Sequence, residues 1–317
     1  MSFRIEGTGM YVPERIVTND EMATIVETSD EWISQRVGVR RRHVCVEETA
    51  ADLAIEAAKR ALENSGVAAE ELDLILAATV SSETVSPSVS CLVQEGIGAT
   101  CMAYDINAAC SAFLFLLETA AGYFARGRVK KVLIVGAERM SRLLDWSDRS
   151  TCVIFGDGAG AAVLTEGDNY RDAVFTVRGG DSVINIPQFP GCSPFYTRET
   201  LKPYIHMNGQ ETFKYAVNAI CHDITTLLER NGLTMDDIAC IVPHQANRRI
   251  IDFAAHKLKV GEDKFFCNIE EYGNTSSASI PIALDEMRQA GKLHRGDLLL
   301  LCAFGGGLAN AACLLEW

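Results

Sequence analysis

The sequence predicts an α/β fold built from two similar halves, in which mixed sheets are layered between helices. Apolar segments of strand length alternate with helical patterns along the 317-residue chain. The pattern at residues 62–76 recurs at 228–242, and a Phe-Gly-x-Gly pattern at 155–158 recurs at 304–307. Two matches in the same order indicate a duplicated βα unit. The predicted halves cover residues 1–168 and 169–317.

The composition excludes several classes of protein. Apolar residues make up 48% of the chain and charged residues 22%, and no apolar run approaches the roughly 18 residues that a membrane span needs. The start reads as a strand and lacks the apolar core and cleavage site of a signal peptide. We therefore expect a soluble, cytoplasmic protein. The net charge of −13 argues against nucleic acid as a partner, because backbone phosphates need a basic face.

The cysteines of this chain do not form a metal or redox motif. There are eleven, and no two have the C-x-x-C spacing. Most lie among apolar residues, as Cys240 and Cys302 do, which is typical of core thiols in a reducing compartment. The His and Cys spacings match no metal-ligand set, so we predict no metal.

The elements of the N-terminal half follow from caps and periodicity. Residues 18–42 carry cap signatures and are predicted to be helical, with a capping box that starts at Thr28. Residues 49–65 form an Ala-rich amphipathic helix that ends at Gly66. The remaining predicted elements are a buried strand at 72–79, a helix from Ser88 to about Gly96, a strand near 101–107, a helix after Cys110, a strand at 131–136 and paired segments over 155–164.

The C-terminal half repeats this order after an irregular insertion at 180–205, which is rich in proline. A buried strand ends just before His244, at the edge where open α/β sheets build their sites. The next helix begins at Asn247. A loop of small polar residues, with Asn274 at its head, then enters another helix.

Cys110 lies where a loop of small residues runs into an apolar helical pattern. A helix that is apolar nearly all round is buried. Its N-terminus has unpaired N–H groups and the positive end of the helix dipole. Both favour a thiolate, which makes Cys110 a candidate nucleophile. The alternative interpretation is a buried structural thiol.

A cysteine, a histidine and an asparagine together suggest covalent thioester chemistry. Cys110 takes the acyl group. His244 and Asn274 each donate a hydrogen bond to the enolate oxygen that forms when a malonyl thioester loses carbon dioxide, and the carbanion attacks the acyl-cysteine. The N–H of Cys110 and one N–H from residues 305–307 are predicted to form an oxyanion hole.

The sequence resembles 3-oxoacyl-[acyl-carrier-protein] synthase III, the β-ketoacyl synthase III of the thiolase superfamily, over nearly its whole length. The motifs stand in the family's order. They are Gly7-Thr8-Gly9, residues 28–33, Asp105 with Ala108-Ala109-Cys110, residues 155–161, residues 243–247, residues 273–276 and residues 304–307.

The resemblance implies a thiolase fold with α-β-α-β-α layers and a homodimer. It implies an initiating condensing enzyme of type II fatty-acid synthesis, in which an acyl-CoA primer acylates the cysteine and malonyl-acyl carrier protein then condenses with it. No cofactor is implied, since both thioesters are substrates. The implied triad is Cys110, His244 and Asn274, with the Gly307 N–H as partner to that of Cys110.

The resemblance also implies binding residues. For CoA they are Trp32, Arg36, Arg149 and Asn247, with Trp32 and Arg149 stacking on the adenine and Arg36 meeting a phosphate. For the acyl pocket they are Ser86, Met207 and Phe213. For the acidic acyl carrier protein they are Lys214, Arg248, Arg249 and Lys257, a basic patch that steers it despite the net charge. Packing and solvated helix faces are the alternative interpretations of these residues.

One departure from the family concerns the primer. Short-chain members carry phenylalanine just before the proline that is Pro87 here, whereas this chain has Ser86. In the family that position helps to close the acyl pocket across the dimer interface. We therefore expect primers longer than acetyl to fit. Asn107 and Ala112, where glycine is common, also depart from the pattern.

Three other functions remain open from the sequence. A secondary-metabolite relative would transfer the acyl group to another acceptor, and a change at His244 or Asn274 would argue for it. A thioester-binding scaffold would have lost Cys110. A cysteine hydrolase would need a base that activates water.

Overall fold

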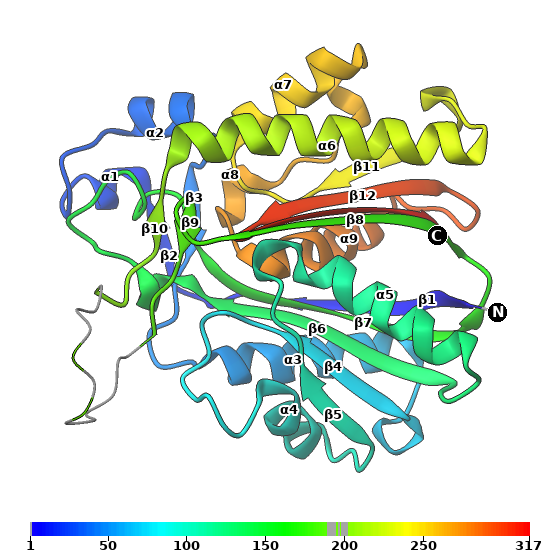
Figure 1. Ribbon diagram of the computed structural model, residues 1–317. Helices are drawn as coiled ribbons and strands as arrows, with labels where there is room; N and C mark the ends of the chain where they lie inside the picture. The colour runs from blue at the N-terminus through cyan, green and yellow to red at the C-terminus, as the bar shows by residue number, and fades with distance from the viewer. Residues whose placement is uncertain (1, 189–194, 196, 198–201) are drawn as a thin grey trace.

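The computed structural model describes residues 2–188, 195, 197 and 202–317. Figure 1 shows two sheets separated by a helical layer, with further helices on both outer faces. The predicted α/β fold of α-β-α-β-α layers is confirmed. Both termini lie at the same end of the molecule.

The sheet of the N-terminal half has the strand order β1-β7-β6-β4-β5. Strand β4 runs parallel to both of its neighbours, whereas β7 is antiparallel to β1 and β6. The parallel centre places the carboxyl ends of β4, β5 and β6 at one edge. The bounds are β1 Ser2–Tyr11, β4 Leu74–Ala78, β5 Met102–Asp105, β6 Lys131–Arg139 and β7 Asp157–Gly167.

The sheet of the C-terminal half repeats this arrangement in the order β8-β13-β12-β11. Strand β11 is parallel to β12, and a bridge between Ile241 and Phe265 extends the sheet where β5 stands in the first one. The bounds are β8 Tyr170–Gly180, β11 Cys240–Pro243, β12 Leu298–Gly305 and β13 Gly307–Glu316.

The helices fill three layers (Figure 1). Helices α3 (Ala50–Ser65) and α4 (Val89–Ile97) cover the outer face of the first sheet. Helices α6 (Gly209–Asn231) and α7 (Arg248–Leu258) cover the outer face of the second. Between the sheets lie α5 and α9, with bounds Ala112–Ala125 and Ser279–Gln289, in a core shared by both halves. No helix in the described part of the chain is long and apolar enough to cross a membrane.

The repeat extends to the turns that lead into the two central helices. The 3-10 turns η2 (Ala109–Ser111) and η6 (Ser276–Ala278) precede α5 and α9. Each begins with a non-glycine residue at positive φ, Ala109 at 47° and Ser276 at 50°. Cys110 and Ser277 therefore occupy the same place in the two copies. The division into domains at 168/169 stays a prediction, and these positions fall in the turn between β7 and β8.

Some local predictions differ from the structure. The region predicted as helical over 18–42 holds two short helices and ends in strand β3, because residues 41–43 pair with β2 far along the chain. The helix cap is Ser29, not Thr28: the Ser29 hydroxyl accepts from the Trp32 N–H at 3.1 Å. The short elements are β2 Ile16–Thr18, α1 Asn19–Met22, α2 Asp30–Arg36, β3 Arg41–His43, η1 Ala69–Glu71, η3 Met140–Leu143, η4 Met235–Asp237, η5 Glu262–Lys264 and α8 Ile269–Tyr272.

The insertion predicted at 180–205 lies partly outside the described residues, which omit 189–194, 196 and 198–201. Its described ends form a two-stranded sheet in which Met207 pairs with Ile184. The strands are β9 Ile184–Asn185 and β10 His206–Met207.

Candidate active site

Cys110 lies in the turn η2, between the end of β5 and the start of α5. The side chain of Asp105 accepts from the N–H groups of Val89 and Ser90 at 2.8 and 2.9 Å, which ties the end of β5 to the start of α4. The side-chain oxygen of Asn107, Oδ1, accepts from the Ala109 N–H at 3.2 Å. These bonds hold the turn so that Cys110 faces the interior between the two halves.

The predicted stabilisation of a thiolate at this helix start is wrong for the resting structure. Burial, aided by the nearby carboxylate of Glu138, raises the pKa of the Cys110 thiol to about 12. The Ser276 hydroxyl lowers the pKa by less than burial raises it. Cys110 therefore rests as a thiol, because desolvation outweighs the helix terminus.

His244 follows β11 and is buried. Its Nδ1 lies 2.6 Å from the Ser279 hydroxyl, and its ring packs edge-on against Phe304 at 5.6 Å. The Ser279 oxygen also accepts from the Gln245 N–H at 3.4 Å. Ser279 therefore occupies Nδ1, and Nε2 is the ring nitrogen left for another partner. Burial lowers the pKa of His244 to about 3, so the ring is a neutral hydrogen-bond donor.

The Asn274 amide is oriented by the turn that follows it. The Ser276 N–H donates to Asn274 Oδ1 at 2.9 Å, so the carbonyl end is occupied and the NH₂ end is the donor. The Asn274 backbone pairs with the segment before β7 through bonds to Ile154 and Gly156. The structure thus presents an amide from the loop just before η6 and an imidazole from the end of β11.

The end of β12 brings these groups together. The Phe304 ring contacts His244, and the next residue, Gly305, lies directly against the backbone of Cys110. Turn η2 packs on both β12 and η6, which carries the bond to Asn274. The predicted triad therefore converges from three separate elements. Gly307, the predicted partner in the oxyanion hole, begins β13 two residues beyond Gly305, and its role stays a prediction.

Gly305 permits this approach because it has no side chain. A Cβ there would lie 2.8 Å from the Cys110 nitrogen and 3.1 Å from its Cβ. We expect Gly305→Ala to slow modification of Cys110 by a thioester by at least about 10²-fold, since small displacements at a reacting centre have effects of this size. Intact-mass kinetics measure the rate. Gly179→Ala is the matched control, because a Cβ there meets nothing within 4 Å. An unaltered rate in Gly305→Ala would contradict the close approach.

Two of the four predicted CoA residues, Trp32 and Arg36, lie on α2, and the other two contact this helix. The Arg149 guanidinium lies 5.0 Å over the Trp32 ring. The Asn247 amide caps α7 and donates to the Arg36 carbonyl at 3.1 Å. Because the Asn247 side chain is engaged at both ends, the structure gives it a role in joining α2 to α7. Its predicted contact with CoA stays a prediction, as do those of the other three.

The predicted acyl-pocket residues are not gathered at one point. Met207 pairs with Ile184, whose side chain lies beside Gly306, near Cys110. Phe213 instead packs against Phe253 and under Arg249, on the outer faces of α6 and α7. Ser86 is exposed in the loop before α4. Their roles in primer binding stay predictions.

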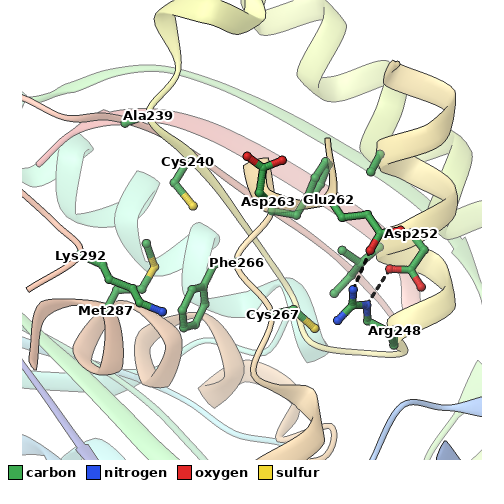
Figure 2. Close-up of a pocket in the computed structure, with 13 residues that line it drawn as sticks. Ala239, Cys240, Arg248, Asp252, Glu262, Asp263, Phe266, Cys267, Met287 and Lys292 are labelled. Atoms are coloured by element: carbon green, nitrogen blue, oxygen red, sulfur yellow. Dashed lines mark hydrogen bonds and ion pairs between the residues drawn. The ribbon is translucent and has the colours of Figure 1, made fainter. Parts of the chain in front are cut away.

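Three of the predicted carrier-binding residues, Lys214, Arg249 and Lys257, are exposed on α6 and α7, which pack side by side. Arg248 differs, since it forms ion pairs with Asp252 at 2.6 Å and Glu262 at 3.0 Å. These ion-paired residues line a cavity of about 560 Å³. Figure 2 shows Cys240 and Lys292 at the side of this cavity away from Arg248. This cavity lies behind α7 and does not include the triad.

Sequence reasoning missed Glu138. It stands at the end of β6, is fully buried and accepts several hydrogen bonds close to Cys110. The signal was a lone acidic residue at the end of an otherwise apolar strand. Nothing local indicates that hydroxyls from both halves surround it.

Comparison with known proteins gives consistent matches. Family models for 3-oxoacyl-[acyl-carrier-protein] synthase III and for its C-terminal part match residues 104–181 and 228–317. The β-ketoacyl-[acyl-carrier-protein] synthase III of Clostridium acetobutylicum is 47% identical, covering 100% of this chain and 99% of its own length. The crystal structure of the Aquifex aeolicus synthase III has a TM-score of 0.93 and 42% identity, covering 99% of this chain and all of its own. The crystal structure of a priming β-ketosynthase from a polyketide pathway has a TM-score of 0.91 and 34% identity, covering 99% of this chain and 96% of its own.

Proposed function

The chain belongs to the 3-oxoacyl-[acyl-carrier-protein] synthase III family, and from that premise we propose that Cys110, His244 and Asn274 perform the family's condensation. The protein is an initiating condensing enzyme of fatty-acid synthesis and thus an acyltransferase. Its substrates as a family member are an acyl-CoA and an acyl carrier protein thioester. The residue roles, the primer and the assembly below are our proposals.

In the first half-reaction, Cys110 attacks the carbonyl carbon of the acyl-CoA. A bond forms between Cys110 Sγ and that carbon, the bond from the carbon to the CoA sulfur breaks, and CoA leaves as the thiol once it has taken up a proton. The Cys110 and Gly307 N–H groups stabilise the tetrahedral oxyanion. Gly305 allows the two backbones to approach closely enough for this.

In the second half-reaction, malonyl-acyl carrier protein loses carbon dioxide. The electrons of the broken bond pass to the thioester oxygen as an enolate, which accepts hydrogen bonds from His244 Nε2–H and Asn274 Nδ2–H. The enolate carbon attacks the acyl-cysteine and releases Cys110. The observation that carries this proposal is the orientation of the two side chains: Ser279 occupies His244 Nδ1, which leaves Nε2 for the substrate, and the Ser276 N–H occupies the Asn274 oxygen, which leaves the NH₂ group.

The exposed cations on α6 and α7 support a docking site for the acidic carrier protein. Arg249 and Lys257 lie one turn before and one turn after Phe253 on α7, and Phe253 is 52% exposed. Lys214 lies on α6, which packs against α7. The complementary charges steer the carrier to this face. Trp32, Arg36 and Arg149 beside it are proposed to hold CoA.

We also propose a homodimer. Strand β5 is the edge of its sheet, and Met102 on it is 48% exposed. Such an edge is a template for a second strand, and a two-fold axis through it pairs two copies. Light scattering coupled to gel filtration measures the mass; a monomer at micromolar concentration would refute this assembly. The ten described cysteines are free thiols, which supports a reducing compartment such as the cytoplasm.

The exposed Ser86 leads to a prediction about primer length. We expect Ser86→Phe to lower kcat/KM for octanoyl-CoA by at least about 10-fold and to leave acetyl-CoA within about twofold, because a large ring restores a wall of the pocket. Ser86→Ala is the control, since it adds no bulk. If the unmodified enzyme already clearly favours acetyl-CoA over octanoyl-CoA, the proposed preference for longer primers is wrong.

Intact-mass analysis tests the whole reaction. The protein is incubated with acetyl-, isobutyryl- or octanoyl-CoA and then with malonyl-acyl carrier protein. An adduct mapped to Cys110 that disappears as 3-oxoacyl carrier protein forms is expected. No adduct with any thioester would refute the role of Cys110.

A second candidate is a condensing enzyme of secondary metabolism with a different acceptor. The similarity to the priming β-ketosynthase favours it, although at lower identity than the fatty-acid enzymes. An adduct that malonyl-acyl carrier protein does not discharge would support this alternative.

A further inference from the structure

Glu138 is a fully buried carboxylate near the end of β6, where the two halves of the chain meet. Isolating a carboxylate from water is costly unless donors replace the water. Hydroxyls and one backbone N–H do so here. Oε2 accepts from Thr79 Oγ1 at 3.3 Å, Val80 N at 3.0 Å and Ser81 Oγ at 2.5 Å, and Oε1 accepts from Ser277 Oγ at 2.7 Å and Ser276 Oγ at 3.1 Å. One oxygen is thus bonded to the N-terminal half, and the other to turn η6 of the C-terminal half.

The two serine hydroxyls fix turn η6 against the first sheet. A Cβ on Gly136, two residues before Glu138 on β6, would lie 2.5 Å from the Ser277 carbonyl oxygen, so the turn lies directly on the strand. Ser276 and Ser277 are both buried, and Ser276 has a φ of 50°. A residue other than glycine keeps such a backbone conformation only where its surroundings hold it. The bonds to Glu138 Oε1 hold the turn in this conformation.

The orientation of the Asn274 amide depends on this turn. The Asn274 backbone is fixed separately, because its N–H donates to the Ile154 carbonyl at 2.9 Å and its carbonyl accepts from the Gly156 N–H at 3.1 Å. These bonds do not determine the side-chain torsions. The Ser276 N–H, which donates to Asn274 Oδ1 at 2.9 Å, fixes the side chain and so decides where the NH₂ group points.

We propose that Glu138 is a positioning residue for decarboxylation: through Ser276 and Ser277 it holds turn η6, and with it the Asn274 amide, in the orientation that donates to the enolate oxygen. The proposal rests on the donor role proposed for Asn274. Donors that are already oriented stabilise a developing oxyanion best, because they need not reorganise during the reaction. A loosened turn therefore weakens catalysis even though the amide is still present.

The acylation half-reaction depends on other contacts. The turn of Cys110 is held by the bond from the Ala109 N–H to Asn107 Oδ1 and by the bond from the Ser111 N–H to the Ala108 carbonyl at 3.2 Å. The Glu138 carboxylate contributes to the raised pKa of the Cys110 thiol, so its removal favours the thiolate. Replacing Glu138 is therefore expected to slow decarboxylation without slowing acylation.

The experiment measures the two half-reactions separately. Release of labelled carbon dioxide from malonyl-acyl carrier protein reports decarboxylation, and intact-mass kinetics with acetyl-CoA report acylation. Glu138→Met keeps the length of the side chain and removes both oxygens. It is expected to slow decarboxylation by about 10–10²-fold, less than the loss of a whole donor, and to leave acylation within about threefold or faster. An unaltered rate of decarboxylation would overturn the proposal.

Glu138→Gln is the conservative replacement. The Val80 N–H is only a donor, so the glutamine oxygen takes the place of Oε2 and the NH₂ group takes the place of Oε1. The NH₂ group then donates to the Ser276 and Ser277 hydroxyls, which keeps the turn tied with the bonds reversed. Glu138→Gln is therefore expected to restore decarboxylation to within about threefold of the unmodified enzyme. A rate as low as that of Glu138→Met would show that the charge matters and not the tie, and would overturn the proposal.

Ser276→Ala tests the same tie if Glu138→Met does not fold. It removes one hydroxyl but keeps the N–H that donates to Asn274, and it is expected to slow decarboxylation by about three- to tenfold. When either change is combined with Asn274→Ala, decarboxylation is expected to be no slower than in Asn274→Ala alone, because the effect passes through the amide. Losses that multiply would indicate a general structural role and would overturn the proposal.

Asp223→Leu is the matched control. Asp223 is a buried carboxylate on α6, bonded to Asn310 at 2.5 Å, and α6 covers the outer face of the second sheet. The change is expected to lower the Tm but to leave the ratio of the two half-reaction rates unchanged. If Glu138→Met also left that ratio unchanged, the proposal would be wrong.

A failure of the proposed function gives a different result. If Asn274→Ala decarboxylates malonyl-acyl carrier protein at the full rate, the donor role of Asn274 is refuted. If Asn274→Ala is slow while Glu138→Met and Ser276→Ala keep the full rate, only the role of Glu138 is refuted.

Discussion

Cys110→Ala is expected to lower the rate of 3-oxoacyl product formation by at least about 10⁴-fold, because alanine cannot form the acyl-enzyme. The burst of CoA released on mixing with acyl-CoA disappears as well. Decarboxylation of malonyl-acyl carrier protein remains measurable in this variant. His244 and Asn274 are held by Ser279 and the Ser276 N–H, not by the thiol, so both donors stay in place.

The matched control is Cys240→Ala, which removes a half-buried thiol in the cavity behind α7. It is expected to keep full activity and a full acyl adduct. An adduct of normal mass in Cys110→Ala would show that another cysteine is acylated. Loss of decarboxylation together with condensation would mean that the substitution has disturbed the whole site.

The second large effect is expected at the two donors. His244→Ala and Asn274→Ala should each slow decarboxylation of malonyl-acyl carrier protein by about 10²–10³-fold, as the loss of one oxyanion donor does elsewhere. Acylation of Cys110 by acyl-CoA should stay within about fivefold, because neither side chain takes the thiol proton. The two half-reactions are followed separately, by release of labelled carbon dioxide and by intact mass.

The role of the histidine as a neutral donor gives a sharper version of this test. Ser279→Ala removes the hydroxyl that bonds to His244 Nδ1 and holds the ring, and a loss of about 10-fold in decarboxylation is expected. With a pKa near 3, His244 stays neutral above about pH 5, so decarboxylation should be flat from pH 5 to pH 8. A step in this profile near pH 6.5 would contradict a buried, neutral ring.

The features that could be predicted from the sequence are those set by local patterns. Glycine ends α3 and α6 at equivalent places, Gly66 at φ 68° and Gly232 at φ 64°, and the recurrence of that signal revealed the repeat. The position of His244 after a buried strand could be predicted, because the end of an apolar run marks the end of such a strand. The roles proposed for the triad still depend on experiment.

The features that could not be predicted depend on contacts between distant segments. In the sequence, Glu138 looks like a surface residue. Its burial could not be predicted, because the hydroxyls that bond to it come from residues 79–81 and 276–277, in different halves. The pKa of Cys110 depends on how closely η6 and Gly305 exclude water, which no helix-start pattern encodes. The strand at 41–43 exists only because β2 lies beside it.

The duplicated turns η2 and η6 bear on how many acyl groups each chain can carry. The fold presents two equivalent positions at the junction of its halves, yet one carries the thiol of Cys110 and the other the hydroxyl of Ser277, which is committed to Glu138. Two nucleophiles at these positions would compete for one primer, and a second acyl group could remain bound opposite the first. With a thiol at only one of these two positions, the proposed mechanism gives each chain a stoichiometry of one acyl group per cycle.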